Sequence, residues 1–201
     1  MTWIKTIPYQ QATGRLKKIY NRLKGPDNKI DNILTAHSLR PHTLEGHLSL
    51  YKNVLHHSGN RHEKWFLETI GVYVSMLNHC GYCVDHHFAG LERLLGDEAY
   101  AKRIYQALAR RSPADVFEEK QVLLLKYAEK LTLRPVSMRQ QDIGQLRDVG
   151  YDDGEILEAN QVIAYFNYAN RTVLGLGVTT QGDILGLSPN NTVDGDDWSH
   201  R

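Results

Sequence analysis

The sequence has few cysteines, almost no net charge and no long apolar run. Of its 201 residues only Cys80 and Cys83 are cysteines, and 24 Lys and Arg nearly balance 23 Asp and Glu. A protein that neutralises many phosphates shows a basic surface, and no basic run is present, so nucleic-acid binding is not expected. No stretch approaches the roughly 18 consecutive apolar residues of a membrane span, so no membrane partner is expected either.

Residues 1–20 also lack the apolar block and small-residue cleavage site of a secretory signal. We therefore expect a cytoplasmic protein. Two cysteines in such a chain are more typical of a redox or metal-binding pair than of a structural disulfide.

Strand patterns are absent as well, because alternating stretches are short and β-branched residues are not clustered between turns. Apolar residues at helical spacing follow Thr13 and end at Gly25-Pro26. Further helices are expected near 33–39, after Pro41, over 98–109, from Ser112-Pro113 to Pro135, after the box-like pair Ser137 and Gln140, and after the pair Asp152 and Glu155.

The segment from about Glu63 to Leu95 is helix-prone throughout, and we predict a break in it near Asn78. Asn caps helices well, and the apolar stripe changes phase at this residue. The fold class is therefore all-α, a multi-helix single domain over residues 1–187, with N-terminal helices in 1–60, a redox core in 61–110 and C-terminal helices in 111–187. The polar, acidic residues 188–201 are expected to form a flexible tail.

The two cysteines are spaced for chemistry. On a helix Cys80 and Cys83 lie about 60° apart with Cα atoms roughly 5 Å apart, within the window of about 4.4–6.8 Å that a disulfide requires. His87 follows Cys83 by one helical turn on the same face. An imidazole there can accept the Cys83 thiol proton or stabilise the thiolate.

Glu68 is a candidate partner of His87. On one continuous helix Glu68 would lie about 120° away from the cysteine face, but a break near Asn78 lets two packed helices bring Glu68 back toward His87. Glu68 could then orient the imidazole, as an acid does in a catalytic triad. A helix beginning at Asn78 favours a thiolate at Cys80, whereas proximity to His87 favours one at Cys83.

These residue types suit peroxide reduction. A thiolate attacks a peroxide oxygen and becomes a sulfenic acid, which a second thiol one turn away converts into a disulfide. An external reductant then restores the dithiol by exchange, and neither a metal nor an organic cofactor is needed.

The spacing over residues 68–87 resembles the core motif of the alkylhydroperoxidase D-like family, within the carboxymuconolactone decarboxylase superfamily. The matching residues are Glu68, Ser75, Asn78, Cys80, Cys83 and His87. The chain as a whole is similar to the peroxidase-related branch, from its N-terminal helices to Asn170-Arg171.

The resemblance implies an all-helical subunit that forms homotrimers or homohexamers and reduces organic hydroperoxides with an external thiol or dithiol. It also implies that Cys83 is the peroxidatic thiol, that Cys80 is the resolving thiol, and that His87 and Glu68 form a proton relay.

The chain departs from the family pattern at one position. Well-studied members have a second histidine directly before the second cysteine, where this chain has Tyr82. A phenol donates hydrogen bonds but is a poor base, so the relay is expected to be shortened unless His79 or His86 compensates. Ser75 and Asn78, like Tyr82, are expected to contact the reacting groups and hold them in place without reacting themselves.

Other interpretations of the pair stay open. The cysteines could be buried structural thiols. They could also bind zinc with His87 and another histidine, although no second cysteine pair exists, and His86 points about 100° away from His87. The superfamily further suggests a protein disulfide oxidoreductase or a decarboxylase-like lyase without redox chemistry.

Several polar residues outside the motif have less defined roles. Asn167, Asn170 and Arg171 lie on an otherwise apolar helix, where they could satisfy one another, a partner subunit or a substrate. The remaining histidines are interpreted as surface or packing residues: His37, His42, His47, His56 and His57.

Overall fold

The structure, a computed structural model, describes residues 1–187, so the predicted tail lies outside the described residues. Within them the chain forms nine α-helices and no strand, which confirms the all-α prediction. The helices are α1 (Gly14–Leu23), α2 (Asn32–Ala36), α3 (Pro41–Tyr51), α4 (Lys64–Leu77), α5 (Gly81–Leu95), α6 (Glu98–Ala109), α7 (Glu119–Leu133), α8 (Gln140–Asp148) and α9 (Asp153–Leu176). None of these helices is both long enough and apolar enough to cross a membrane.

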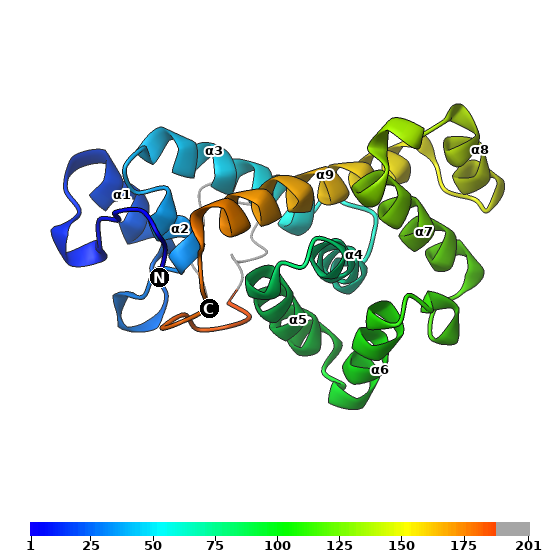
Figure 1. Ribbon diagram of the computed structural model, residues 1–201, viewed down its shortest axis with the longest axis horizontal. Helices are drawn as coiled ribbons and strands as arrows, with labels where there is room; N and C mark the ends of the chain where they lie inside the picture. Colours follow the sequence, from blue (N-terminus) through cyan, green and yellow to red (C-terminus); the bar gives the residue numbers. More distant parts are fainter. Residues whose placement is uncertain (188–201) are drawn as a thin grey trace.

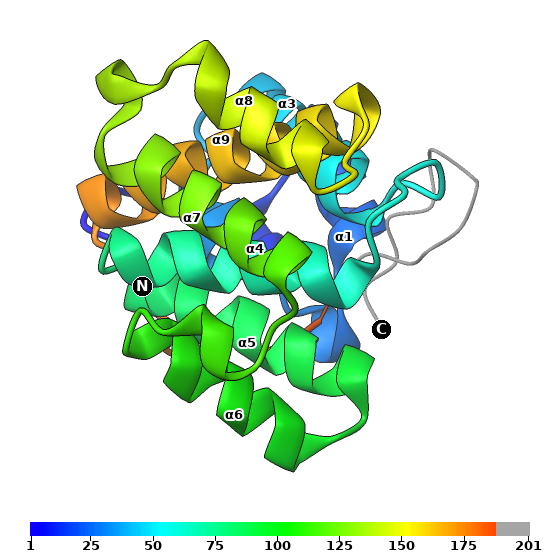
Figure 2. The ribbon, with the colours of Figure 1, turned by 90° about the vertical axis from the view of Figure 1, so that its right-hand side faces the viewer.

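Helix α4 lies at the centre of the molecule, between α9 and α7 on one side and α5 and α6 on the other (Figure 1; Figure 2). Its side chains are buried almost all round, including the polar residues Glu68, Thr69 and Ser75. A helix that is apolar on every side is typical of a domain interior. At Gly71 the ring of Phe166 on α9 occupies the place that a Cβ atom would take, so the two helices approach closely.

The buried side chains form three clusters. The main core surrounds α4 and contains residues of α5, α6, α7, α8 and α9. Helices α1, α2 and α3 form a smaller second core. Ile33 contacts all three clusters, and the third, at their junction, contains both cysteines: Ala36, Cys80, Tyr82, Cys83, Val173 and Val178.

The predicted helix starts at Thr13, Pro41, Glu98 and Asp152 are confirmed, and two others are displaced. Thr13 is the N-cap of α1, and Asp152 caps α9 by accepting a hydrogen bond from the Glu155 backbone N–H at 2.9 Å. Ser112-Pro113 opens only the 3₁₀ turn Pro113–Asp115. Helix α7 begins later, because Glu118 and Gln121 form the capping box there.

Ser137 does not cap α8. It ends the 3₁₀ turn Pro135–Ser137, and its hydroxyl donates to the Arg134 carbonyl at 2.7 Å. Arg139 is the N-cap instead, and its backbone N–H donates to the Asp142 carboxylate at 2.7 Å.

After α9, residues 178–187 return along the N-terminal segment and α2. The Thr179 backbone N–H donates to the Met1 carbonyl at 2.9 Å. The Asn32 side-chain amide donates to the carbonyls of Thr179 and Gln181, at 2.8 and 3.0 Å. The Asn32 backbone N–H donates to both carboxylate oxygens of Asp183 at 3.1 Å. These bonds hold Asp183 at the start of α2.

Candidate active site

The predicted break between α4 and α5 positions the cysteines. Asn78 ends α4, His79 adopts a left-handed backbone conformation with φ 56°, and Cys80 is the N-cap of α5. The second helix therefore begins at Gly81, three residues after Asn78, and Asn78 acts as the C-cap of the first helix. The Cys80 backbone N–H donates to the Ser75 carbonyl at 2.9 Å, which fixes the turn.

Cys80 and Cys83 are free thiols whose Sγ atoms lie 2.7 Å apart and share a hydrogen bond. The hydrogen bond from Cys83 lowers the pKa of the Cys80 thiol, against the effect of burial and with a smaller contribution from the Asn170 amide. The same hydrogen bond, together with burial, raises the pKa of the Cys83 thiol well above its ordinary value. When the pair loses one proton, the negative charge is therefore favoured on Cys80, at the helix N-terminus.

Glu68 and His87 meet as the break predicted. His87 Nδ1 lies 2.7 Å from Glu68 Oε2, and the Glu68 side chain is 3 % exposed. Burial alone would raise the pKa of Glu68, but the charge and hydrogen bond of His87, with contributions from His56 and Arg93, hold it below its usual value. His56 Nε2 lies 3.9 Å from Glu68 Oε1. A buried carboxylate between two imidazoles can orient His87 and balance its positive charge when His87 is protonated.

A polar network supports the cysteines from α9. The Asn78 amide donates to Asn167 and Asn170 at 3.1 and 2.9 Å, and the Asn170 amide donates to the Ser75 hydroxyl at 3.0 Å. Arg171 donates to Asn167 at 2.8 Å. Of the three uses considered for these α9 residues, hydrogen bonding to one another is the one seen within this chain.

Tyr82 has a clear structural role. Its hydroxyl donates to Asp183 at 2.8 Å and accepts from the Ile33 backbone N–H at 3.2 Å. Burial and the charges of Asp183 and Asp31 raise the pKa of Tyr82 well above its ordinary value. Tyr82 thus joins α5 to α2 and to the returning chain, and it remains a hydrogen-bond donor, as its phenol chemistry indicated.

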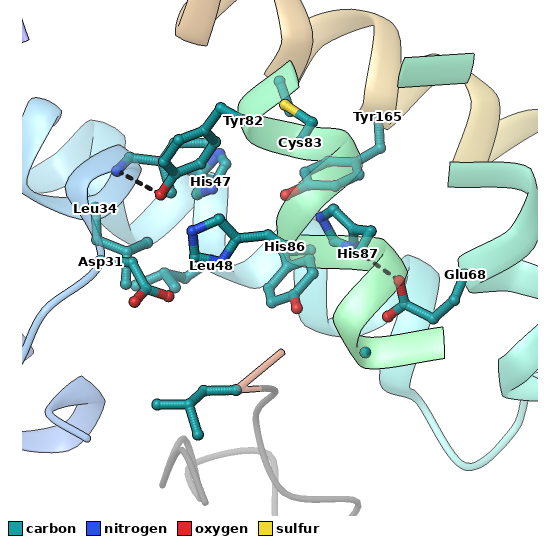
Figure 3. Close-up of a pocket in the computed structure, with 15 residues that line it drawn as sticks. Asp31, Leu34, His47, Leu48, Glu68, Tyr82, Cys83, His86, His87 and Tyr165 are labelled. Carbon is teal, nitrogen blue, oxygen red and sulfur yellow. Dashed lines mark hydrogen bonds and ion pairs between the residues drawn. The ribbon is translucent and has the colours of Figure 1, made fainter. Parts of the chain in front are cut away.

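Cys83, Glu68 and His87 face one cavity of about 50 Å³ between α5, α9 and the N-terminal helices (Figure 3). Its other lining residues are Asp31, Ile33, Leu34, His47, Leu48, Tyr51, Tyr82, His86, Gly90, Tyr165, Ala169 and Leu187. Cys83 is 3 % exposed, whereas Cys80 is completely buried and does not line the cavity. A small molecule in the cavity would therefore meet Cys83 first.

Sequence reasoning missed several cavity residues. Tyr165 is buried beside Tyr51, with ring centroids 5.7 Å apart, and lies close to Cys83 in Figure 3. Burial raises the pKa of Asp31 to about 6, partly offset by His86 and reinforced by Asp183. These residues belong to α3, α9, the start of α2 and the returning chain, and no spacing rule links them to the cysteines.

The remaining histidines differ in burial. His42, His57 and His79 are exposed, and His37 is half-buried. His47 and His56 are buried, as packing residues would be, but His47 lines the cavity and His56 approaches Glu68. Among residues 1–187, no three His, Cys, Asp or Glu side chains cluster so that they could hold a metal ion.

The chain is similar in structure to several solved proteins. An uncharacterized peroxidase-related protein from a Silicibacter species matches with a TM-score of 0.78 and 21% identity, over 90% of this chain and 93% of that one. Another, from Ralstonia eutropha and described as an alkylhydroperoxidase AhpD core, matches with a TM-score of 0.78 and 18% identity over the same shares. The chain has the alkylhydroperoxidase D-like fold. This confirms, at the level of the fold, the resemblance that the motif indicated.

Two more distant likenesses agree with this fold. A protein of unknown function from Agrobacterium tumefaciens, described as a candidate antioxidant defence protein AhpD, matches with a TM-score of 0.58 and 25% identity over 71% of this chain and 93% of that one. The debrominase Bmp8, a cysteine-to-alanine variant bound to 2,3,4-tribromopyrrole, matches with a TM-score of 0.64 and 14% identity over 90% and 91%. No protein-family model matches the chain, and neither does any curated protein.

Proposed function

We propose that the chain is a thiol-dependent hydroperoxide reductase that uses Cys83 as the attacking thiol and Cys80 as the resolving thiol. One observation carries the proposal: two free sulfurs lie 2.7 Å apart, and one of them, that of Cys83, faces the same small cavity as the His87–Glu68 pair. The alkylhydroperoxidase D-like fold and the peroxidase-related names of similar structures support it.

The first step is loss of one proton from the dithiol to His87, whose charge Glu68 balances. The proton that remains is shared between the sulfurs, and when it rests on Cys80 the negative charge faces the cavity on Cys83. The Cys83 thiolate attacks the terminal peroxide oxygen, the O–O bond breaks, and the alcohol leaves after taking one proton. Sulfur is oxidised by two electrons and the peroxide is reduced by two.

The Cys80 thiol then attacks the Cys83 sulfenic acid, which forms the S–S bond and releases water. Dithiol and hydroperoxide thus give disulfide, alcohol and water. An external thiol or dithiol restores the pair by exchange. We propose that the working form is a homotrimer or homohexamer in the cytoplasm. Analytical ultracentrifugation would measure the mass of the assembly and so test the number of subunits.

Burial favours this function over protein disulfide exchange. Cys80 is completely buried and Cys83 is 3 % exposed, so a folded protein substrate would have difficulty bringing a disulfide to either sulfur. A lyase without redox chemistry would use acid–base groups and leave the thiol pair idle.

The test is a free-thiol count on reduced protein before and after one equivalent of cumene hydroperoxide, for wild type, Cys80→Ser and Cys83→Ser. Wild type should lose both thiols, Cys80→Ser should stop at a trappable sulfenic acid on Cys83, and Cys83→Ser should keep its thiol. Survival of both wild-type thiols would refute the peroxidase function. A sulfenic acid on Cys80 would reverse the two roles.

A further inference from the structure

Cys83 is followed on α5 by two histidines, and both line the same cavity. His86 lies three residues and His87 four residues after Cys83, so each side chain is a one-turn neighbour of Cys83 on the helix surface. Figure 3 shows the two imidazoles projecting from α5 in different directions. The proposed reaction assigns a role to His87 alone.

Each imidazole is held by its own carboxylate. His87 pairs with Glu68 of α4, and His86 Nε2 lies 3.2 Å from Asp183 Oδ2 in the returning chain. The Asp183 side chain is 2 % exposed, and it also accepts hydrogen bonds from the Tyr82 hydroxyl and the Asn32 backbone N–H. Three donors, two from α5 and one from the start of α2, therefore fix this carboxylate and, through it, the ring of His86.

The ring plane of His86 is fixed as well. It packs against the ring of Tyr82, with centroids 4.5 Å apart. Asp31 faces His86 from the start of α2, beside Asp183. A positioned imidazole that contacts a carboxylate through Nε2 keeps its other nitrogen free for proton transfer to a bound molecule. The cavity thus offers a second positioned proton donor beside Cys83.

Peroxide reduction needs two proton transfers at different atoms. One removes the thiol proton, and the other neutralises the alkoxide that leaves when the O–O bond breaks. An alkoxide is a strong base, so the step is slow unless a proton arrives as the bond breaks. In the proposed function His87 and Glu68 serve the first transfer, and the second needs a protonated group that faces the leaving oxygen.

We propose that His86, oriented by Asp183, is the general acid that protonates the leaving oxygen of the hydroperoxide. This inference rests on the proposed function. As the Cys83–O bond forms and the O–O bond breaks, protonated His86 gives its proton to the alkoxide and becomes neutral. His87 releases to solvent the proton that it took from the thiol pair, and His86 takes up one proton from solvent. The net reaction is that thiol and hydroperoxide give sulfenic acid and alcohol.

The test compares two oxidants whose leaving groups differ in basicity. Cumene hydroperoxide releases a strongly basic alkoxide, whereas peracetic acid releases acetate, which needs no proton. The measurement is the initial rate of thiol loss from reduced protein by rapid quench, for wild type, His86→Gln, Asp183→Asn and the control His42→Gln, an exposed histidine on α3.

His86→Gln should slow the reaction with cumene hydroperoxide by about 10²-fold and that with peracetic acid by less than about threefold. Asp183→Asn should shift the ratio of the two rates in the same direction by about tenfold, because the imidazole is then less well oriented. His42→Gln should leave both rates unchanged. If His86→Gln does not fold, Asp183→Asn and His86→Asn carry the same comparison.

Equal loss of both rates in a folded His86→Gln protein would overturn the proposal, because a disturbed cavity does not distinguish leaving groups. Unchanged rates with both oxidants would overturn it too. A wild-type protein that keeps its thiols with cumene hydroperoxide refutes the proposed function itself, whereas an active wild type with an unchanged rate ratio in His86→Gln refutes only the role of His86.

Discussion

Two histidine–carboxylate pairs flank Cys83, and they are built in different ways. The pair of His87 and Glu68 joins residues 19 positions apart on two regular helices of the main core. The pair of His86 and Asp183 joins residues 97 positions apart, one on a helix and one on the chain that returns after α9. His87 thus takes its partner from a central helix, and we call this pair the helical side of the site. His86 takes its partner from the returning chain, and we call this pair, with Asp31, the outer side.

The difference separates two kinds of support. Glu68 is a buried anion whose neighbouring positive groups hold its pKa down. On the other side, Asp31 and Asp183 lie together, and burial raises the pKa of Asp31 to about 6. The negative charge of Glu68 is compensated on the helical side, whereas two carboxyl groups lie close together on the outer side.

The largest expected effect is that of Glu68→Gln. Loss of the carboxylate should slow thiol oxidation by about 10²-fold with cumene hydroperoxide and equally with peracetic acid, because thiol activation precedes either reaction. Rapid-quench thiol counts measure both rates, and Glu98→Gln, an exposed change on α6, is the control. If Glu68→Gln slowed only the reaction with cumene hydroperoxide, both histidine–carboxylate pairs would act in protonation of the leaving group.

Asp31→Asn should stabilise the protein above pH 6. The pKa of Asp31 rises from 3.8 to about 6 on folding, so the folded state keeps a proton that the unfolded state releases between these values. Stability is therefore lost as pH rises through this window, by about 3 kcal/mol. Urea unfolding at pH 7.5 and pH 3.5 should show the gain at the higher pH alone.

The exposed change Asp148→Asn on α8 is the matched control and should show no such pH dependence. An equal gain for Asp31→Asn at both pH values would show that the charge of Asp31 is not the cause.

The close approach of α4 and α9 on the helical side can be tested with two glycines. Gly71→Ala places a methyl group against the Phe166 ring and should lower the free energy of unfolding by about 1–2 kcal/mol. Gly46→Ala, in the exposed middle of α3 with open space around it, should raise it by up to about 1 kcal/mol. Thermal or urea unfolding measures both, and a gain from Gly71→Ala would show that the two helices separate easily.

The smallest expected effect is that of Tyr82→Phe. It removes the hydrogen bonds to Asp183 and to the Ile33 backbone N–H and should cost about 1 kcal/mol of unfolding free energy. Because Tyr82 is an anchor in this site and not a base, the rate of thiol oxidation should fall less than in Asp183→Asn. Tyr105→Phe is an exposed control. A large loss of rate without loss of stability would assign Tyr82 to proton transfer.

The helical side was predictable because local rules act there. Helical spacing placed Cys80, Cys83 and His87 on one face, and the break near Asn78 folded Glu68 back onto His87. Displaced starts such as Ser137 show the usual limit, since a neighbouring capping pair took over. Elements were thus predicted better than their ends.

The outer side could not be predicted from spacing. Asp183 reaches His86 only because residues 178–187 are tied to α2 and to the N-terminal segment, and sequence separation hides such contacts. His56 approaches Glu68 from the π-helix Lys52–His56, whose wider turn breaks the regular period. Asn170 showed one usable signal, a polar residue on an otherwise apolar helix.

Burial of both sulfurs also selects the molecule that regenerates the site. Within residues 1–187, a disulfide between Cys80 and Cys83 would be approached from the small cavity, because Cys83 lines it together with Leu187 of the returning chain and Cys80 is completely buried. A slim dithiol can pass there, whereas a folded reductase would first have to displace that segment and break the bonds of Asp183 to Asn32, Tyr82 and His86. With a protein as electron donor, turnover would therefore be gated by the opening of one short loop.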